Sequence, residues 1–157
     1  MKILTFIIPI FNKIIKINIL NKFKKISKEI RVIIIDDGSN IFYKKKNKEI
    51  VSKFKNIEFF FLKNNKGQSF ACNYGLKKTN TDYIWFFDSD DHVNVNTIKK
   101  VVSTTRKLNG DGYLLPSSNM YNGKIVKKVW PSKRPHDFND LRNNGQMVNT
   151  SCAIFKT

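Results

Sequence analysis

The sequence predicts an α/β fold in which a mostly parallel sheet is covered by helices on both faces. Four short apolar runs of strand length alternate with segments whose apolar residues recur at helical spacing. The runs are rich in Ile and Phe, which is typical of strands buried on both faces. Because consecutive parallel strands are joined by right-handed crossovers, this alternation favours a three-layer α/β/α sandwich. After residue 110 strand-length runs no longer alternate with helical segments, and the pattern predicts a C-terminal β-hairpin.

The first half of the chain contains two strands and two helices. Residues 3–10 form a near-continuous apolar run, which predicts a strand. Ile, Leu and Phe then recur at helical spacing among Lys and Asn, so we expect an amphipathic helix over residues 14–27. Residues 30–35 predict a second strand, and the Ser and Asn that follow it can cap a helix over residues 39–54.

The next segment repeats this order. Residues 57–62 predict a third strand, and the Asn and Gly of residues 64–67 predict a turn. A short helix is expected over residues 69–78 and a fourth strand over residues 83–87. Residues 95–108 have apolar side chains at helical spacing and end at an Asn-Gly pair, which predicts a further helix.

The C-terminal part has shorter elements. Residues 113–115 and 125–130 flank the Asn-Gly pair at 122–123, a signal for a hairpin with a type I′ turn. Residues 131–147 predict a long polar loop, and residues 152–155 predict a last strand.

The length and composition suit one folded domain over residues 1–157. The chain has 157 residues and 41% hydrophobic residues, which disfavours disorder. No apolar stretch approaches the roughly 18 residues that would span a bilayer. The N-terminus is a poor signal peptide because Pro9 interrupts its apolar run. Cys72 and Cys152 have no metal-ligand spacing and are expected to be reduced, so we expect a cytoplasmic protein.

The net charge of +17 leaves two interpretations open. It is typical of proteins that bind nucleic acid or an anionic membrane surface. However, only four of the 29 basic residues are arginine, and the chain is also crowded with Asn, Ile and Phe, which indicates a compositional bias. A lysine-rich solvated surface explains the charge without a partner, whereas a functional basic face would support peripheral contact with the inner face of the cell membrane.

The acidic residues are few and unevenly placed. Five of the 12 form two clusters, each directly after an apolar run: Asp36, Asp37, Asp88, Asp90 and Asp91. Ligands of parallel sheets bind beyond the carboxyl ends of the strands, so we expect both clusters to meet in one crevice. Carboxylates are hard ligands suited to Mg²⁺ or Mn²⁺. The Gly-rich phosphate-binding motifs G-x-x-x-x-G-K-[ST] and G-x-G-x-x-G are absent at the expected positions, so a bound nucleotide would need a metal.

Four motifs follow one another along the chain. They are Ile7-Ile8-Pro9-Ile10-Phe11-Asn12, then Ile33-Ile34-Ile35-Asp36-Asp37-Gly38-Ser39, then Asn65-Lys66-Gly67 with Ala71-Cys72-Asn73-Tyr74-Gly75, then Phe87-Asp88-Ser89-Asp90-Asp91. Together they resemble the motifs of one family, the GT-A-fold, family 2 inverting glycosyltransferases, over about residues 3–130. Their order and spacing are far more specific than a lone D-x-D motif.

This resemblance implies a Rossmann-type donor site for a nucleotide-diphosphate sugar, which we expect to be a UDP-sugar. Residues 1–110 would be the donor-binding half, and residues 111–157 part of the acceptor side. The resemblance implies that Asp36 binds the nucleoside and that Asp88, Asp90 and Asp91 hold Mn²⁺ or Mg²⁺. The residues expected to bind the nucleotide sugar are Pro9, Phe11, Asn12, Asp36, Asp37, Lys66, Gly67, Asn73, Asp88, Ser89 and Asp90. The acceptor would be a saccharide or a lipid-linked saccharide, and no specific nucleic acid would be bound.

The chain departs from the family pattern at two points. Cys72 stands where the family usually has an Arg near the nucleotide, and Lys66 is the candidate to replace that charge. The family's general base comes from a later acceptor-side segment, and the sequence ends at Thr157 before such a motif, with Asp137 and Asp140 as weak candidates. We therefore expect a donor-binding portion or truncated enzyme. The alternatives are a nucleotide-sugar-binding module without turnover and a basic nucleic-acid-binding α/β domain.

Overall fold

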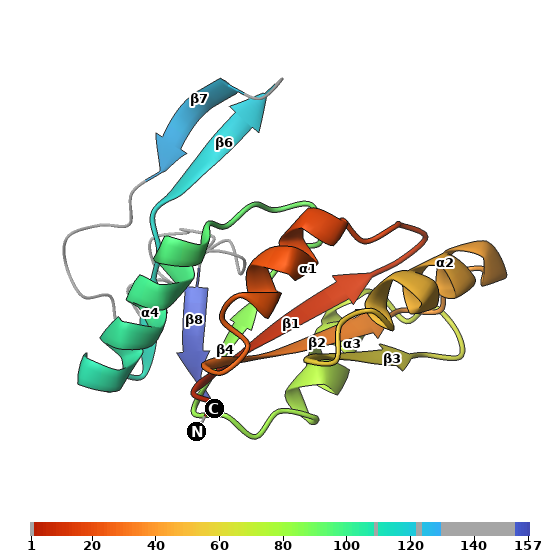
Figure 1. Ribbon diagram of the computed structural model, residues 1–157, viewed down its shortest axis with the longest axis horizontal. Coiled ribbons are helices and arrows are strands. Elements are labelled where there is room, and N and C mark those ends of the chain that lie inside the picture. The colour runs from red at the N-terminus through yellow and green to blue at the C-terminus, as the bar shows by residue number, and fades with distance from the viewer. Residues whose placement is uncertain (1, 109, 122–123, 130–152) are drawn as a thin grey trace, which may run out of the picture.

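The computed structural model describes residues 2–108, 110–121, 124–129 and 153–157 (Figure 1). Strands and helices alternate along the first 108 residues, and the elements in the described residues that follow are strands, as predicted. The elements in chain order are β1 (Leu4–Ile10), α1 (Ile17–Lys24), β2 (Ile30–Asp36), α2 (Ile41–Val51), β3 (Ile57–Phe61), α3 (Gln68–Leu76), β4 (Tyr83–Phe86), α4 (Val95–Leu108), β5 (Gly112–Leu114), β6 (Ser117–Tyr121), β7 (Lys124–Val129) and β8 (Ala153–Lys156).

Within the described ranges, six strands form one sheet in the order β3-β2-β1-β4-β8-β5. β1 lies between β2 and β4 and is parallel to both, and β3 is parallel to β2. β8 pairs antiparallel with β4 and with β5. The sheet is thus mostly parallel with an antiparallel edge, and the carboxyl ends of β1, β2, β3 and β4 lie at the same edge.

The sheet is covered by helices on both faces, which gives the three layers that the sequence predicts. Val32 and Ile34 of β2 belong to a large apolar cluster that includes residues of α1, α2 and α4. Ile33 and Ile35 belong to a second cluster with Ala71 of α3. Because successive side chains of a strand point to opposite faces, α3 lies on one face and the other three helices on the opposite one.

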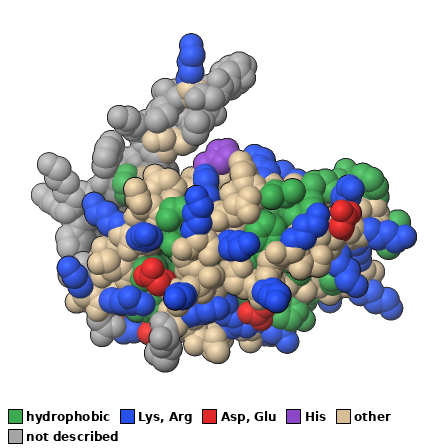
Figure 2. Space-filling view, viewed as in Figure 1, with side chains coloured by type: hydrophobic (Ala, Val, Ile, Leu, Met, Phe, Trp, Pro, Cys, Tyr) green, Lys and Arg blue, Asp and Glu red, His purple; other side chains and the backbone are tan. Residues whose placement is uncertain are grey.

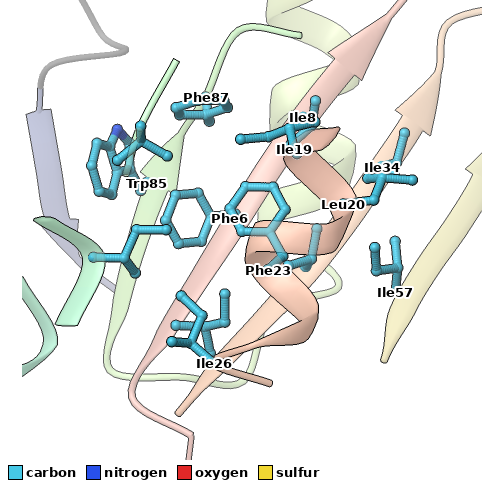
Figure 3. Packing of buried hydrophobic residues seen from close by; sticks show 14 of the residues in the cluster. Phe6, Ile8, Ile19, Leu20, Phe23, Ile26, Ile34, Ile57, Trp85 and Phe87 are labelled. Atoms are coloured by element: carbon cyan, nitrogen blue, oxygen red, sulfur yellow. The ribbon is translucent and has the colours of Figure 1, made fainter. Parts of the chain in front are cut away.

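Aromatic side chains from three elements fill the centre of the larger cluster (Figure 3). The ring of Phe6 in β1 lies with its centroid 4.7 Å from that of Phe23 in α1 and 4.9 Å from that of Trp85 in β4. Phe87 adds an edge contact at 5.8 Å. Buried aromatic pairs of this kind contribute packing beyond their buried area, so they join α1 firmly to β1 and β4.

Two helices differ in how well the sequence predicts their starts. Asn40 caps α2 as expected, because its Oδ1 accepts hydrogen bonds from the amides of Phe42 and Tyr43 at 3.1 and 3.4 Å. α1 begins at Ile17, three residues later than expected. The amide of Ile15 donates to Asn47 Oδ1 at 2.9 Å, which holds this segment outside the helix. In the described part of the chain, no helix has the length and apolar character required to cross a bilayer.

The predicted hairpin has a different first strand. β7 pairs antiparallel with β6 (Figure 1), whereas residues 113–115 were expected to be its partner. β5, which includes Tyr113, instead pairs with β8 across the edge of the main sheet. The expectation was wrong because a local turn signal cannot show that a strand pairs with a segment about 40 residues later. The turn at 122–123 and the expected loop at 131–147 lie outside the described residues.

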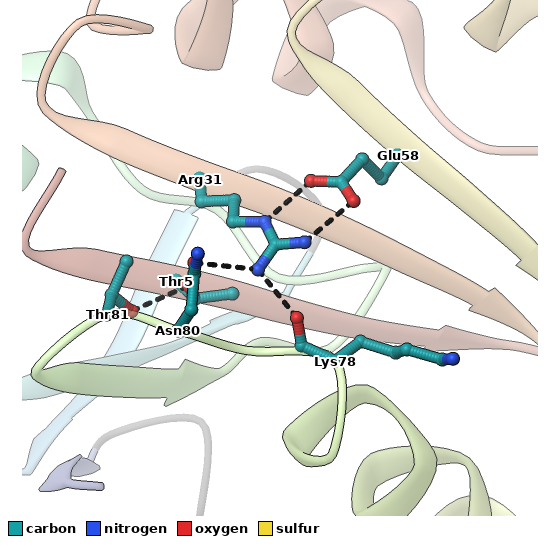
Figure 4. A network of polar contacts seen from close by, with 6 residues as sticks. All are labelled: Thr5, Arg31, Glu58, Lys78, Asn80 and Thr81. Carbon is teal, nitrogen blue, oxygen red and sulfur yellow. Dashed lines mark hydrogen bonds and ion pairs between the residues drawn. The ribbon is translucent and has the colours of Figure 1, made fainter.

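A polar network joins the strands at the amino edge of the sheet, opposite the carboxyl ends (Figure 4). Arg31 of β2 donates from Nε and Nη2 to the two carboxylate oxygens of Glu58 in β3, at 2.6 and 2.7 Å. Its Nη1 donates to the carbonyl of Lys78 at 2.6 Å and to Asn80 Oδ1 at 2.9 Å. The hydrogen bond from Arg31 lowers the pKa of Glu58. This paired arrangement connects β2, β3 and the segment before β4.

We expect Glu58→Gln to lower the free energy of unfolding by about 0.5–1 kcal/mol at pH 7, since Glu58 is partly exposed. The lowered pKa means that the carboxylate stabilises the fold above its unfolded-state pKa, and that this contribution is lost as the pH falls through the folded-state pKa. Urea unfolding should therefore show the difference between wild type and variant at pH 7 and none in acid. Glu49→Gln, at an exposed site on α2, is the control, and an equal effect of both variants would contradict the prediction.

Candidate functional site

A cleft of about 490 Å³ lies at the carboxyl edge of the sheet. Four segments contribute to it: the end of β1, the end of β2, the turn before α3 and the turn after β4. The residues that line it are Pro9, Ile10, Phe11, Lys13, Asp37, Asn65, Gly67, Gln68, Asp88, Ser89 and Asp90. The prediction that the two acidic clusters meet in one crevice is therefore confirmed.

Asp37 connects the end of β2 to the turn before α3. Its side chain is buried, and each carboxylate oxygen accepts one backbone amide: Oδ1 from Lys66 at 2.9 Å and Oδ2 from Gly67 at 2.8 Å. Its own amide donates to the carbonyl of Ile10 at 2.8 Å. Because both oxygens are occupied by the protein, Asp37 shapes the wall of the cleft.

Gly38 is required by the close approach of the same turn. Its φ of +74° lies in the left-handed region, which glycine adopts readily. A Cβ at this position would lie 2.3 Å from both the carbonyl carbon of Asn64 and the amide nitrogen of Asn65. The Asp-Gly pair at residues 37–38 therefore lets the turn before α3 pack directly on the end of β2.

Asp36 lies beneath the cleft surface. Its side chain is fully buried, and Oδ1 accepts the amide of Ser39 at 2.8 Å. Oδ2 has no hydrogen-bond partner among the described residues, and Asp36 does not line the cleft. The role in nucleoside binding that the family resemblance implies for Asp36 stays a prediction.

The second acidic cluster presents two carboxylates to the cleft. Asp88 Oδ1 accepts a hydrogen bond from Gln68 Nε2 at 2.9 Å, and Asp90 Oδ2 pairs with Lys13 Nζ at 2.9 Å. Burial, and then the charges of Asp91 and Asp90, raise the pKa of Asp88. The hydrogen bond from Lys13 lowers the pKa of Asp90. The cleft thus combines two acids with opposite electrostatic surroundings.

These two carboxylates fit a divalent cation. Mg²⁺ is usually held in proteins by one or two carboxylates, with waters and phosphate oxygens as the other ligands. Asp88 and Asp90 line the same cleft and meet this requirement. Asp91 does not line the cleft, and in the part of the chain that the structure describes no three His, Cys, Asp or Glu side chains lie close enough to form a metal site. A cation at Asp88 and Asp90 would retain open positions for a ligand.

The other predicted site residues divide into two groups. Pro9, Phe11, Gly67 and Ser89 line the cleft as expected. Asn12 is outside the lining and supports it, because Asn12 Oδ1 accepts the amide of Asn40 at 2.9 Å.

Lys66, Cys72 and Asn73 are not part of the described cleft lining. The ammonium group of Lys66 lies 4.5 Å from the ring centroid of Phe70, and Asn73 is exposed on α3. Burial, and then the charge of Asp88, raises the pKa of the Cys72 thiol to about 11, so this group is neutral at pH 7. Asp137 and Asp140, the weak candidates for a general base, lie outside the described residues.

The residues expected to bind the nucleotide sugar leave out three polar residues of the cleft: Lys13, Gln68 and Asn65, which was noted only as part of a motif. Lys13 follows the first motif directly, but one lysine does not stand out in a chain with so many. Gln68 is the first residue of α3 and follows the Asn-Lys-Gly turn, so its position beside a nucleotide motif was the available signal.

The surface charge does not gather at one place on the face shown in Figure 2. Lys and Arg side chains are scattered over the described part of that face, with apolar side chains between them. This distribution agrees with the interpretation of the lysine excess as a compositional bias and gives no support on this face for a nucleic-acid groove.

Comparisons with known proteins place the chain in a family. The model of glycosyl transferase family 2 matches residues 5–157, and the chain belongs to this family. It is 34% identical over 102 residues to an uncharacterized glycosyltransferase of Haemophilus influenzae, and 33% identical over 118 residues to the poly(ribitol-phosphate) β-N-acetylglucosaminyltransferase TarP of Staphylococcus aureus. These alignments cover 64% and 71% of the chain but only 41% and 35% of the two relatives.

A solved structure agrees with this assignment. The crystal structure of residues 1–349 of TarS from S. aureus in complex with UDP-GlcNAc superposes with a TM-score of 0.66 and 27% sequence identity. The match covers 81% of this chain and 37% of the TarS chain. The GT-A fold expected from the family resemblance is confirmed, and the chain spans well under half the length of each of these proteins.

Proposed function

We propose that this chain is the nucleotide-sugar-binding part of an inverting glycosyltransferase that uses a UDP-sugar. The observation that carries the proposal is the convergence of both acidic clusters and the Asn-Lys-Gly turn on one cleft at the carboxyl edge of the sheet. The likeness to TarS, whose structure contains UDP-GlcNAc, supports a uridine nucleotide with an N-acetylhexosamine as the donor class.

Each wall of the cleft has a separate role in this proposal. Pro9 and Phe11, at the end of β1, form an apolar wall for the nucleoside. Asp37 fixes the backbone of Lys66 and Gly67, so the turn before α3 is ordered before the donor binds. Such preorganisation reduces the entropy lost on binding. Asp88 and Asp90 face the position proposed for the diphosphate.

Asp88 and Asp90 would hold Mg²⁺ or Mn²⁺. The metal, when bound, would neutralise charge on the departing nucleoside diphosphate. Asp88 and Asp90 by themselves cannot do this, because two carboxylates that face a diphosphate repel it. Gln68 donates to Asp88 and thereby fixes its orientation. The proposed cofactor therefore follows from the charge of the site as well as from the family resemblance.

We propose that the acceptor is a saccharide of a cell-surface polymer or glycolipid. The donor sugar would be transferred to it with inversion at the anomeric carbon. The name of TarP, which describes transfer of N-acetylglucosamine to poly(ribitol phosphate), supports a polymeric acceptor. Inversion in one displacement requires a base within hydrogen-bond reach of the acceptor hydroxyl. Asp88 and Asp90 in the described cleft are assigned to the cation, so we do not assign the role of this base to either of them.

The proposal is tested by a thermal-shift panel followed by calorimetry. UDP, UDP-GlcNAc, GDP, GDP-mannose and CDP are each added with and without Mg²⁺, because a ligand that binds the native state raises the apparent stability. We expect UDP and UDP-GlcNAc to give the largest shifts and to need the metal. An absence of nucleotide binding under all conditions, together with oligonucleotide binding that falls steeply with salt, would favour the nucleic-acid alternative instead.

A further inference from the structure

The segment that follows β1 is held in place by side chains from the β2–α2 region. Asn47, a fully buried residue of α2, donates from Nδ2 to the carbonyl of Lys13 at 2.8 Å and accepts the amide of Ile15 at 2.9 Å. The amide of Asn12 donates to Ser39 Oγ at 2.9 Å. Asn47 therefore fixes the chain at Lys13 and after it, and Ser39 fixes the chain before Lys13.

This anchoring places a cationic side chain in the cleft. Lys13 lines the cleft, and its Nζ lies 2.9 Å from Asp90 Oδ2. The side chains of Lys13 and Asp90 are 43% and 63% exposed, so water reaches both groups. A pair as exposed as this contributes little to stability, and it can exchange partners at small cost.

We propose that Lys13 is a diphosphate-binding residue of the donor site: it neutralises Asp90 in the free protein and contacts the donor phosphates when a divalent cation takes Asp90. This inference rests on the proposed function of the cleft. The lysine stem has four flexible carbons and three donors on its ammonium group, so it changes partner while the backbone stays held by Asn47. Lys66 lies over Phe70 and supplies no cation to the described cleft lining.

The proposal predicts two effects of opposite sign for Lys13→Met. Binding of UDP in saturating Mg²⁺ should weaken by about tenfold or more, because a charge-assisted hydrogen bond is lost. Binding of Mn²⁺ alone should strengthen by about two- to fivefold, because no ammonium group competes for Asp90. A variant that merely disturbed the fold would weaken both.

Calorimetry with MnCl₂ alone, and with UDP in MgCl₂, tests these effects on the chain as it stands. Lys45→Met, which removes an exposed charge from α2, is the matched control for net charge, and Lys13→Arg should retain most of the UDP affinity. The proposal is supported if only Lys13→Met shows both changes. Wild-type UDP affinity in Lys13→Met would overturn it and leave the proposed function intact. A failure of the wild type to bind UDP would overturn both.

Discussion

Gly38→Ala is expected to lower the free energy of unfolding by about 2–5 kcal/mol. The added Cβ would lie 2.3 Å from two backbone atoms of the turn before α3, and backbone cannot move aside as a flexible side chain can. The left-handed φ of +74° adds strain for any residue with a Cβ. The variant should also lose nucleotide affinity, because the displaced turn carries the amides that Asp37 holds.

Gly67→Ala measures the cost of the backbone strain without the steric clash that is expected at position 38. Gly67 also has a positive φ, of +89°, but a Cβ there would meet no heavy atom within 4 Å. Its cost should therefore be the strain alone, about 1–3 kcal/mol. Urea unfolding followed by circular dichroism measures both variants. Equal destabilisation by the two substitutions would show that the close packing of the turn on β2 is not the reason for glycine at position 38.

Replacing Asp88 and Asp90 together by Asn is expected to remove the metal-dependent part of UDP binding. In the wild type we expect Mg²⁺ to raise the UDP affinity by about tenfold or more, equivalent to about 1.4 kcal/mol. In the double variant the affinities with and without Mg²⁺ should agree, because neutral amides replace both proposed carboxylate ligands. Asp88→Asn should not lower the free energy of unfolding at neutral pH. The raised pKa of Asp88 means that the fold disfavours its charged form.

The matched control for this experiment removes two exposed acids elsewhere, Asp82 and Asp111. It changes the net charge of the chain by the same amount and leaves the cleft intact. Calorimetric titration of UDP into each protein, with and without Mg²⁺, gives the ratio of affinities. A double variant of Asp88 and Asp90 that keeps the wild-type ratio would assign the metal to other residues.

The central sheet could be predicted from the sequence because its signals are local. Each parallel strand is a mostly apolar run, and the Asn40 cap and the turn at residues 64–67 stand next to the elements they end or begin. The pairing of β5 and of β6 could not be assigned in this way. Their pairing depends on partners far along the chain or on a register that the apolar pattern does not specify.

The site could be predicted in outline and not in its details. The pair Asp36 and Asp37 indicated a site at the end of the strand. Because neighbouring residues there point in opposite directions, only Asp37 reaches the cleft, and the sequence did not show which of the two would do so. The family resemblance implies Asp91 as a metal ligand together with Asp88 and Asp90, yet the turn places only the other two in the cleft lining. Lys13 was hidden by the number of lysines, and its importance depends on Asn47, a residue 34 positions away.

The central claim is that a nucleoside diphosphate binds in the cleft between the turn before α3 and the second acidic cluster. Titration of the ¹⁵N-labelled chain with UDP in Mg²⁺, followed by amide resonances, tests this claim most directly. The account predicts that the signals of Gly67, Gln68, Ser89 and Asp90 shift, while those of Lys78 and Asn80 at the opposite edge of the sheet do not. Shifts confined to the opposite edge, or no shifts at saturating UDP, would contradict it.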